Sequence, residues 1–201
     1  MKIRQLYRGS VVFDIDGVLA DFEGAFCQTF GEYNRHLYSL TDRFPENLTK
    51  SIYNFIVSPE SYTDLSPIFG GIVALNQFKQ RGYHILVVTG RDKSLRDVTK
   101  KWLSRYNVHY NQLYFAKNKL EAIKDFEFVH PNLKVQYIID DSVEVLDTVS
   151  DGLGIPALAW EQEWNRHYFP KIRYDQEIMK VVGTENGTNW YPIWEKVGKD
   201  E

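Results

Sequence analysis

The fold of this chain is decided by the stretch VVFDIDGVLADF at residues 11–22. Its opening run of apolar residues predicts a strand that is buried on both faces. Side chains two positions apart share one face of a strand, so Asp14 and Asp16 point the same way where this strand ends. Gly17 then lets the backbone turn away sharply. We therefore predict a pair of carboxylates at the tip of a buried strand.

Two carboxylates placed in this way are typical of phosphoryl transfer. The Asp14 carboxylate is ionised at neutral pH, so it can attack phosphorus without a helper base and form an aspartyl phosphate. Asp16 can protonate the leaving oxygen and later take a proton from the hydrolytic water. A calcium-binding loop is excluded, because it needs glycine and glutamate where this chain has Leu19 and Ala25.

Two later segments add groups that suit a phosphate. The run HILVVT at residues 84–89 predicts a second buried strand, and the hydroxyl of Thr89 at its tip can donate to a phosphoryl oxygen. A short strand follows near residues 111–115, and its loop carries Lys117 and Lys119. Either lysine could neutralise charge between the nucleophile and the phosphate.

A further apolar run, at residues 135–139, ends in Asp140 and Asp141. Adjacent carboxylates repel each other, and the carboxylates of the first strand would add to that repulsion. Four acids would also repel an anionic substrate. A hard cation that prefers oxygen ligands resolves both problems, and the sequence therefore predicts Mg²⁺ as the cofactor.

The spacing of strands and helices predicts an α/β fold with a three-layer, Rossmann-like parallel sheet. Strands are expected near 10–15, 84–89, 111–115, 136–140 and 155–159, and helices near 70–82, 93–106, 118–127 and 143–152. Ligands of such sheets bind at the carboxyl ends of the strands, where the acidic residues and Thr89 lie. The segment at about 22–66 is too long for a simple crossover, so we expect it to form a small helical cap.

Taken in order, these residues resemble the four motifs of the haloacid dehalogenase (HAD) superfamily of phosphatases. The matching positions are Asp14, Asp16, Gly17, Thr89, a downstream lysine, Asp140 and Asp141. Within the superfamily, DGVLADFE at residues 16–23 is most similar to the 5′(3′)-deoxyribonucleotidases. The stretch SPESYTDLSPIFG at 58–70 resembles the segment with which that family leaves its cap. The resemblance extends from about 11 to 165.

The resemblance implies a role for each matching residue. Asp14 would be the nucleophile, Asp16 the general acid and base, and Thr89 the hydroxyl that holds the phosphate. Lys119 would neutralise charge, with Lys117 in a supporting position. Mg²⁺ would be held by Asp14, the backbone carbonyl of Asp16, Asp140 and Asp141. Phe22 would lie against the nucleobase, the HAD core would comprise 1–21 plus 67–201, and the cap would comprise 22–66.

The residues after Thr89 leave the substrate open. Eukaryotic deoxyribonucleotidases have serine and proline there, whereas this chain has Gly90 and Arg91, as polynucleotide 3′-phosphatases of the same superfamily do. Gly90 and Arg91 are therefore candidate substrate-binding residues. Further basic residues follow along the predicted helix near 93–106. Together with Arg91 they form either a strip near the site or a solvated helix face, and they are Lys93, Arg96, Lys100 and Arg105.

Three hypotheses for the function follow from these residues. The first is hydrolysis of a small-molecule nucleotide, a (deoxy)ribonucleoside monophosphate, and the second is hydrolysis at a polynucleotide end. The third is a phospho-receiver or a nucleotide-binding module without turnover. Receivers place their acidic pair at the first strand and the phosphorylated aspartate later, which is the reverse of the order in this chain. The motif order therefore favours an enzyme.

Composition sets broader limits on the chain. Its 201 residues are 43% hydrophobic, which suffices for one main domain with a small insertion. The net charge of −3 gives no reason to expect strong nonspecific binding to nucleic acid. No apolar run predicts a membrane span and no leader precedes the first strand, so we expect a cytoplasmic protein. The oligomeric state stays open, a homodimer included, and the tail after Trp164 is expected to pack on the domain as a helix or extended segment.

Overall fold

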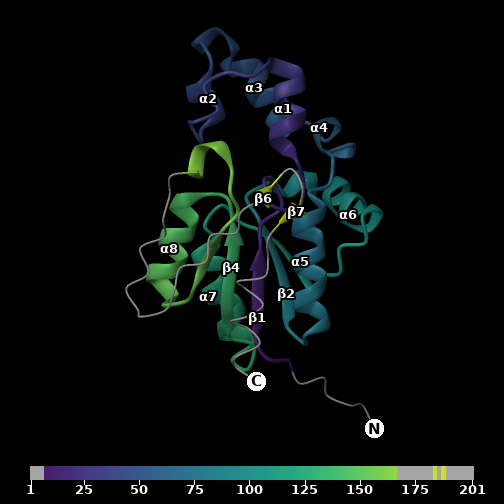
Figure 1. Ribbon diagram of the computed structural model, residues 1–201, viewed down its shortest axis with the longest axis vertical. Helices are drawn as coiled ribbons and strands as arrows, with labels where there is room; N and C mark the ends of the chain where they lie inside the picture. Colours follow the sequence, from purple (N-terminus) through teal and green to yellow (C-terminus); the bar gives the residue numbers. More distant parts are fainter. Residues whose placement is uncertain (1–6, 167–182, 185–186, 189–201) are drawn as a thin grey trace.

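The computed structural model describes residues 7–166, 183–184 and 187–188. Its centre is a five-stranded parallel sheet in the order β3-β2-β1-β4-β5 (Figure 1). The strands are β1 (Ser10–Phe13), β2 (His84–Thr89), β3 (Gln112–Phe115), β4 (Val135–Asp140) and β5 (Ala157–Ala159). The predicted α/β, Rossmann-like parallel sheet is therefore confirmed.

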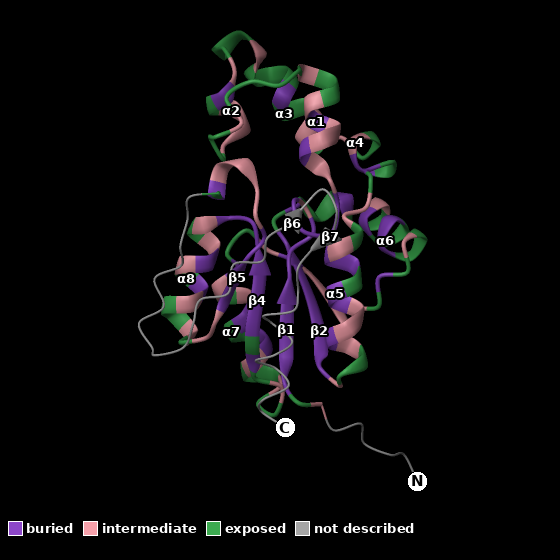
Figure 2. Cartoon of the chain, in the orientation of Figure 1, coloured by how far each residue is buried: buried purple, intermediate pink, exposed green. Residues whose placement is uncertain are grey.

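Helices cover both faces of this sheet, because its strands are apolar on both sides (Figure 2). On β1, Val11 and Phe13 pack into one cluster with α5 (Phe69–Gln80) and α6 (Arg96–Arg105). Val12 points the opposite way and packs with α7 (Lys119–Val129) and α8 (Val143–Leu153). The period of two along β1 thus divides the core into two layers with the sheet between them.

The first strand is shorter than the 10–15 expected from the sequence. The amide of Asp14 still donates to the carbonyl of Ile139 on β4, but the chain then turns. The carbonyl of Ile15 accepts the amides of Leu19 and Ala20, each at 2.8 Å, in place of a partner on a neighbouring strand. This turn carries the backbone away from the sheet at the position where the acidic side chains lie.

The segment of residues 22–66, the inserted segment, is mainly helical and lies over the carboxyl ends of the strands (Figure 1). Its elements are α1 (Phe22–Phe30), α2 (Leu40–Arg43), the 3₁₀ turn η1 (Glu46–Leu48), α3 (Thr49–Val57) and α4 (Glu60–Thr63). The Asp21 side chain caps α1 by accepting the amide of Gly24 at 2.8 Å. The rings of Phe22, Phe26 and Phe30 pack in sequence along α1, as their spacing predicts.

Three shorter features complete the described residues. The 3₁₀ turns are η2 (Lys93–Leu95) and η3 (Glu163–Asn165), and β6 (Gly183–Thr184) pairs antiparallel with β7 (Gly187–Thr188) beside α5. The prediction for the tail after Trp164 lies almost wholly outside the described residues. Among the helices that are described, none combines the length and apolar character needed to cross a bilayer.

Candidate active site

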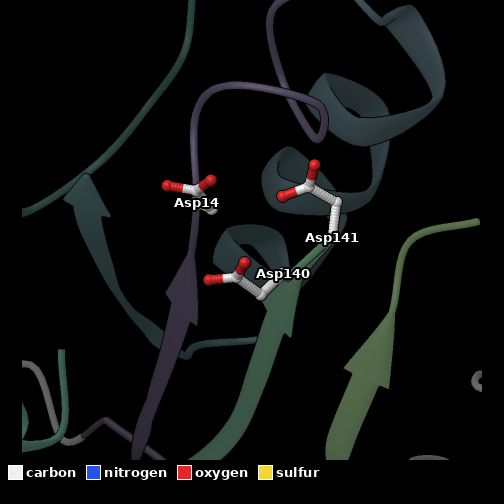
Figure 3. Close-up of side chains that lie close together, drawn as sticks. All are labelled: Asp14, Asp140 and Asp141. Atoms are coloured by element: carbon white, nitrogen blue, oxygen red, sulfur yellow. The ribbon is translucent and has the colours of Figure 1, made fainter. Parts of the chain in front are cut away.

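Three neighbouring strands bring the predicted residues to one edge of the sheet. Asp14 follows β1, Thr89 ends β2, and Asp140 ends β4 with Asp141 directly after it. Because all three strands run parallel, their carboxyl ends meet at this edge. Figure 3 shows the three carboxylates of Asp14, Asp140 and Asp141 gathered there. Residues far apart in the sequence thus form a single acidic centre.

Lys119, the first residue of α7, reaches into this centre. Its Nζ lies 2.7 Å from Oδ1 of Asp14 and 2.6 Å from Oδ2 of Asp140. Burial lowers the pKa of Lys119, but the charges of the two carboxylates outweigh burial and raise the pKa above its ordinary value. Lys117 is exposed instead, so the geometry favours Lys119 as the charge-neutralising lysine.

The acids outnumber the cation that neutralises them. Asp14, Asp140 and Asp141 each offer a carboxylate oxygen, and these oxygens lie within 4.8 Å of one another. Burial, opposed by Lys119 and reinforced by Asp140, raises the pKa of Asp14 to about 7. Burial and the charges of Asp140 and Asp14 likewise raise the pKa of Asp141 well above its usual range. Three buried oxygen donors short of positive charge fit a divalent cation such as Mg²⁺.

This raised pKa predicts that Mg²⁺ binding depends on pH. The expectation from the sequence that Asp14 is ionised at neutral pH is therefore corrected for the metal-free protein, because burial leaves Asp14 partly protonated there. Asp14 ionises only as the pH rises through about 7, and protons compete with the cation below that value. We expect the apparent Mg²⁺ affinity to rise by about tenfold or more per pH unit between pH 5.5 and 7, because Asp141, whose pKa is also raised, must lose its proton as well. Calorimetric titration at pH 5.5, 6.5 and 8 measures this, and an affinity that is constant over the range would contradict it.

The same ionisation affects the metal-free protein. The pKa of Asp14 in the folded protein lies above its value of 3.8 in the unfolded chain. Asp14 therefore contributes fully to the stability of the fold below about pH 4, and this contribution is lost as the pH rises through about 7. Mg²⁺ should therefore raise the unfolding temperature more at pH 8 than at pH 5.5.

Gly17 explains the close approach of the first motif to Asp141. Its φ is +80°, and a Cβ at this position would lie 2.3 Å from Oδ2 of Asp141. Any side chain would therefore collide with a predicted metal ligand, as well as strain the backbone. The carbonyl of Gly17 accepts a hydrogen bond from Nε2 of Gln162 at 2.8 Å, which ties this turn to the segment after β5.

Asp16 is held by Arg91, a contact that the sequence did not indicate. Nε of Arg91 donates to Oδ2 of Asp16 at 2.7 Å and Nη2 donates to Oδ1 at 2.6 Å, which is a bidentate pair. Nη1 donates to Oγ1 of Thr99 at 3.0 Å, and the guanidinium lies 4.4 Å from the ring centroid of Tyr62. The Arg91 side chain is 1% exposed. This geometry supports positioning of Asp16 by Arg91 rather than contact with substrate.

The basic residues that could form a strip near the site do not share one environment. Arg91 points inward to Asp16, whereas Lys93, Arg96, Lys100 and Arg105 are exposed. Arg96 lies over the ring of Phe115. Arg105 pairs with Asp64 at 2.9 Å.

Replacing Arg91 by lysine tests its role. A lysine keeps the charge but cannot hold both oxygens of a carboxylate with a planar fork. We expect kcat of Arg91→Lys to fall about 10- to 100-fold with KM almost unchanged, because Asp16, the predicted general acid, is misplaced while substrate binding remains. Steady-state kinetics measures this, with Arg96→Lys on the exposed face as the control. A raised KM with unchanged kcat would instead show that Arg91 binds substrate.

The remaining predicted residues are placed as follows. The Thr89 side chain is buried at the tip of β2, where Oγ1 accepts the Arg91 amide at 3.3 Å, and Gly90 is exposed. Phe22 is half-buried, and its ring stacks on Tyr62 at 5.3 Å between centroids. Its partial exposure leaves a surface for a nucleobase, and that role stays a prediction.

Comparison with known proteins gives a consistent assignment. The family model "5′ nucleotidase, deoxy (pyrimidine), cytosolic type C protein" matches residues 8–167. A protein of Bacillus cereus described as a putative nucleotidase is 27% identical over 139 residues, which are 67% of this chain and 70% of that one.

Two solved structures share the fold. A haloacid dehalogenase-like hydrolase from Streptococcus pneumoniae is 17% identical with a TM-score of 0.57, over 84% of this chain and 93% of that one. A chain of the Pnkp1/Rnl/Hen1 complex is 19% identical with a TM-score of 0.50, over 76% of this chain and 46% of that one. At such identities the likeness concerns the fold alone. The family match covers most of the chain, and the chain therefore belongs to the 5′ nucleotidase, deoxy (pyrimidine), cytosolic type C family of HAD phosphatases.

Proposed function

We propose that the protein is a Mg²⁺-dependent phosphatase that hydrolyses deoxyribonucleoside monophosphates through an aspartyl phosphate. The observation that carries this proposal is the fixed carboxylate of Asp14. It is buried, paired with Lys119 at 2.7 Å, and set beside Asp140 and Asp141 at the carboxyl edge of the sheet. A nucleophile held in one orientation saves much of the entropic cost of reaching the transition state.

The chemistry would proceed in two steps at phosphorus. First, an Asp14 oxygen forms a bond to phosphorus while the bond from phosphorus to the ester oxygen breaks, and Asp16 gives that leaving oxygen a proton. In the second step Asp16 takes a proton from water, the water oxygen attacks phosphorus, and the bond to Asp14 breaks to release phosphate. Lys119 balances charge on the phosphoryl group, and Thr89 donates its hydroxyl to a phosphoryl oxygen.

The carboxylates of the acidic centre fit a divalent cation. Asp14, Asp140 and Asp141 would hold it, with the Asp16 carbonyl as a further oxygen ligand. When bound, the cation supplies positive charge that draws a phosphate toward the acidic centre. This chain's own residues orient the nucleophile and move the protons.

The inserted segment would cap the site. It covers the edge of the sheet where the acids lie (Figure 1). Its first residue is Phe22, which begins α1 and follows the Asp16 motif in the sequence. Such a cap can exclude water from a phosphoenzyme and can stack an aromatic ring on a nucleobase. We include the boundaries 22–66 and a cytoplasmic location in this proposal as predictions, and the oligomeric state stays open.

Hydrolysis at a polynucleotide 3′ end is the second candidate. Gly90 and Arg91 favour it in sequence, and Lys93 and Lys100 are exposed on the following turn and helix. The donors of Arg91, however, are engaged by Asp16 and Thr99. The net charge of −3 also favours a small substrate.

One substrate panel under identical conditions separates the two candidates. It holds deoxy- and ribonucleoside 5′- and 3′-monophosphates, a 3′-phosphorylated oligonucleotide and sugar phosphates, each assayed for released phosphate with Mg²⁺ and with chelator. We expect the highest kcat/KM for a deoxyribonucleoside monophosphate and no activity after chelation. Preference for the oligonucleotide would move the assignment to end processing, and full activity in chelator would contradict the metal requirement.

A further inference from the structure

The inserted segment meets the core at Trp164, beside the acidic centre. The ring of Tyr38, in the loop between α1 and α2, contacts the Trp164 ring edge-on at 6.1 Å between centroids. The guanidinium of Arg43 lies 5.2 Å from the centroid of the same ring. Nε1 of Trp164 in turn donates to the carbonyl of Asp141 at 3.2 Å. Only one side chain therefore separates Tyr38 from the backbone of a predicted metal ligand.

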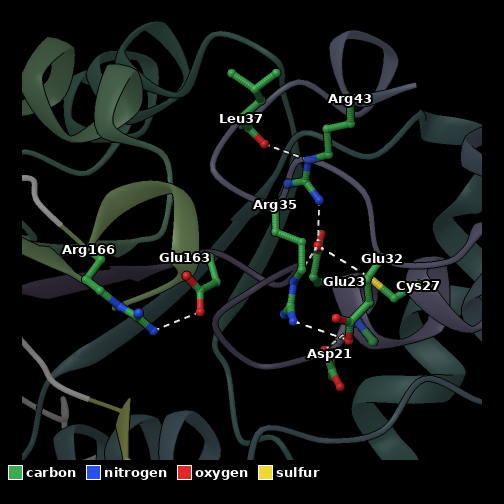
Figure 4. Close-up of polar contacts among 10 residues, drawn as sticks. Asp21, Glu23, Cys27, Glu32, Arg35, Leu37, Arg43, Glu163 and Arg166 are labelled. Atoms are coloured by element: carbon green, nitrogen blue, oxygen red, sulfur yellow. Dashed lines mark hydrogen bonds and ion pairs between the residues drawn. The ribbon is translucent and has the colours of Figure 1, made fainter. Parts of the chain in front are cut away.

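Arg43 fixes the loop that carries Tyr38. Its side chain is 2% exposed, its Nε donates to the carbonyl of Leu37 at 2.6 Å, and its Nη1 pairs with Glu23 of α1 at 2.5 Å. Figure 4 shows Arg43 between Leu37 and Glu23. Because Leu37 directly precedes Tyr38, a buried ion pair anchors the backbone from which Tyr38 extends. The position of Tyr38 is thus built into the segment.

The ring contact with Trp164 places Tyr38 near the acids of the core, because Trp164 itself donates to the Asp141 carbonyl. Burial raises the pKa of the Tyr38 hydroxyl above the ordinary value, the negative charges of Asp141, Asp14 and Asp140 raise it further, and a hydrogen bond with the Ser142 side chain opposes them. The hydroxyl is therefore a neutral donor within the field of all three carboxylates. The residue as a whole is 56% exposed, so a ligand can still approach it.

We propose that Tyr38 contacts the substrate, with its hydroxyl donating a hydrogen bond to a phosphoryl oxygen of the phosphomonoester held at Asp14. Without substrate, the hydroxyl uses Ser142 as its partner. A neutral donor suits this place, because it binds an anionic phosphate without adding charge to a crowded site. Lys119 and Thr89 come from the core, so Tyr38 is the group through which the inserted segment would hold the phosphate. This inference rests on the proposed function.

The substitution Tyr38→Phe tests the hydroxyl alone, because the ring that contacts Trp164 remains. We expect the dissociation constant for inorganic phosphate, measured by calorimetry with saturating Mg²⁺, to rise about tenfold, as loss of one hydrogen bond to a charged group implies. KM for the preferred monophosphate should rise by a similar factor, and the unfolding temperature should not change. Tyr53→Phe is the matched control, because Tyr53 lies in the same segment and is 63% exposed.

The outcomes separate this inference from the proposed function. Weaker phosphate binding in Tyr38→Phe supports the inference even if no nucleotide in the panel is hydrolysed, in which case the proposed substrate fails and the contact stands. Phosphate binding and kinetics equal to those of the unmodified protein would overturn the inference and leave the phosphatase proposal intact. An equal loss in Tyr53→Phe would also overturn it, because the effect would not depend on the position of Tyr38.

Discussion

Replacing Asp14 by asparagine is expected to lower phosphatase activity by about 10⁴-fold or more, which removes it for practical purposes. An amide of the same size cannot form the acyl phosphate, and Asp14 is the acid that Lys119 holds in place at the tip of β1. The fold should survive the change. Burial already opposes the charge of Asp14, so a neutral group at this position costs little in the metal-free protein.

The measurement is kcat with saturating Mg²⁺ and the preferred monophosphate, together with the unfolding temperature of the metal-free protein. Asp125→Asn is the control, because this substitution makes the same chemical change at an exposed position on α7. Turnover of the purified Asp14→Asn protein at even one per cent of the starting rate would show that another group attacks phosphorus.

Replacing Lys119 by methionine should have the second largest effect. The substitution keeps the length of the side chain but leaves Asp14 and Asp140 without the cation that pairs with both. We expect kcat to fall about 10²- to 10³-fold, because positive charge at the phosphoryl group is lost. The free energy of unfolding of the metal-free protein should fall by about 3–5 kcal/mol, as when one partner of a buried ion pair is removed.

Two comparisons make this result specific. Lys117→Met removes an exposed lysine two positions earlier that is predicted only to support Lys119, and it should change stability little and lower kcat far less than Lys119→Met. Mg²⁺ should restore part of the lost stability in Lys119→Met, because the cation supplies charge to the same acids. Denaturant unfolding with and without Mg²⁺ measures both effects. Equal losses for the two lysine variants would contradict the assigned role of Lys119.

Much of the architecture could be predicted because the strands carry an unusually clear signal. Residues 85–88 and 137–139 are hydrophobic and buried on both faces of the sheet, which only a sheet covered by two helical layers can achieve. Polar residues at the tips of such strands must then meet at one edge, so the grouping of Asp14, Thr89 and Asp140 follows from the strands alone. The sequence predicts that β1 ends at residue 15, whereas it ends at Phe13. The reason is the turn in which the Ile15 carbonyl accepts the amides of Leu19 and Ala20, because such a turn leaves no periodic pattern in the sequence.

The contacts that the sequence did not predict join residues that are far apart in the chain and meet only when the chain is folded. Arg91 belongs by position to a basic run, and only the packing of α6 and Tyr62 shows that it turns inward to Asp16. Tyr38 belongs to an aromatic segment whose members mostly pack on each other, and no spacing rule distinguishes it. The choice of Lys119 over Lys117 rested on resemblance, because two lysines flanking a helix start look alike until the helix is placed.

The central claim is that phosphorus becomes esterified to Asp14, and chemical trapping tests it most directly. The protein is mixed with substrate and Mg²⁺, quenched during turnover and treated with borohydride, which reduces an aspartyl phosphate to homoserine with release of phosphate. Peptide mass spectrometry then locates the product. Homoserine at position 14, dependent on substrate, is the result that the account predicts. Conversion at another residue, or none at position 14 during measured turnover, would contradict it.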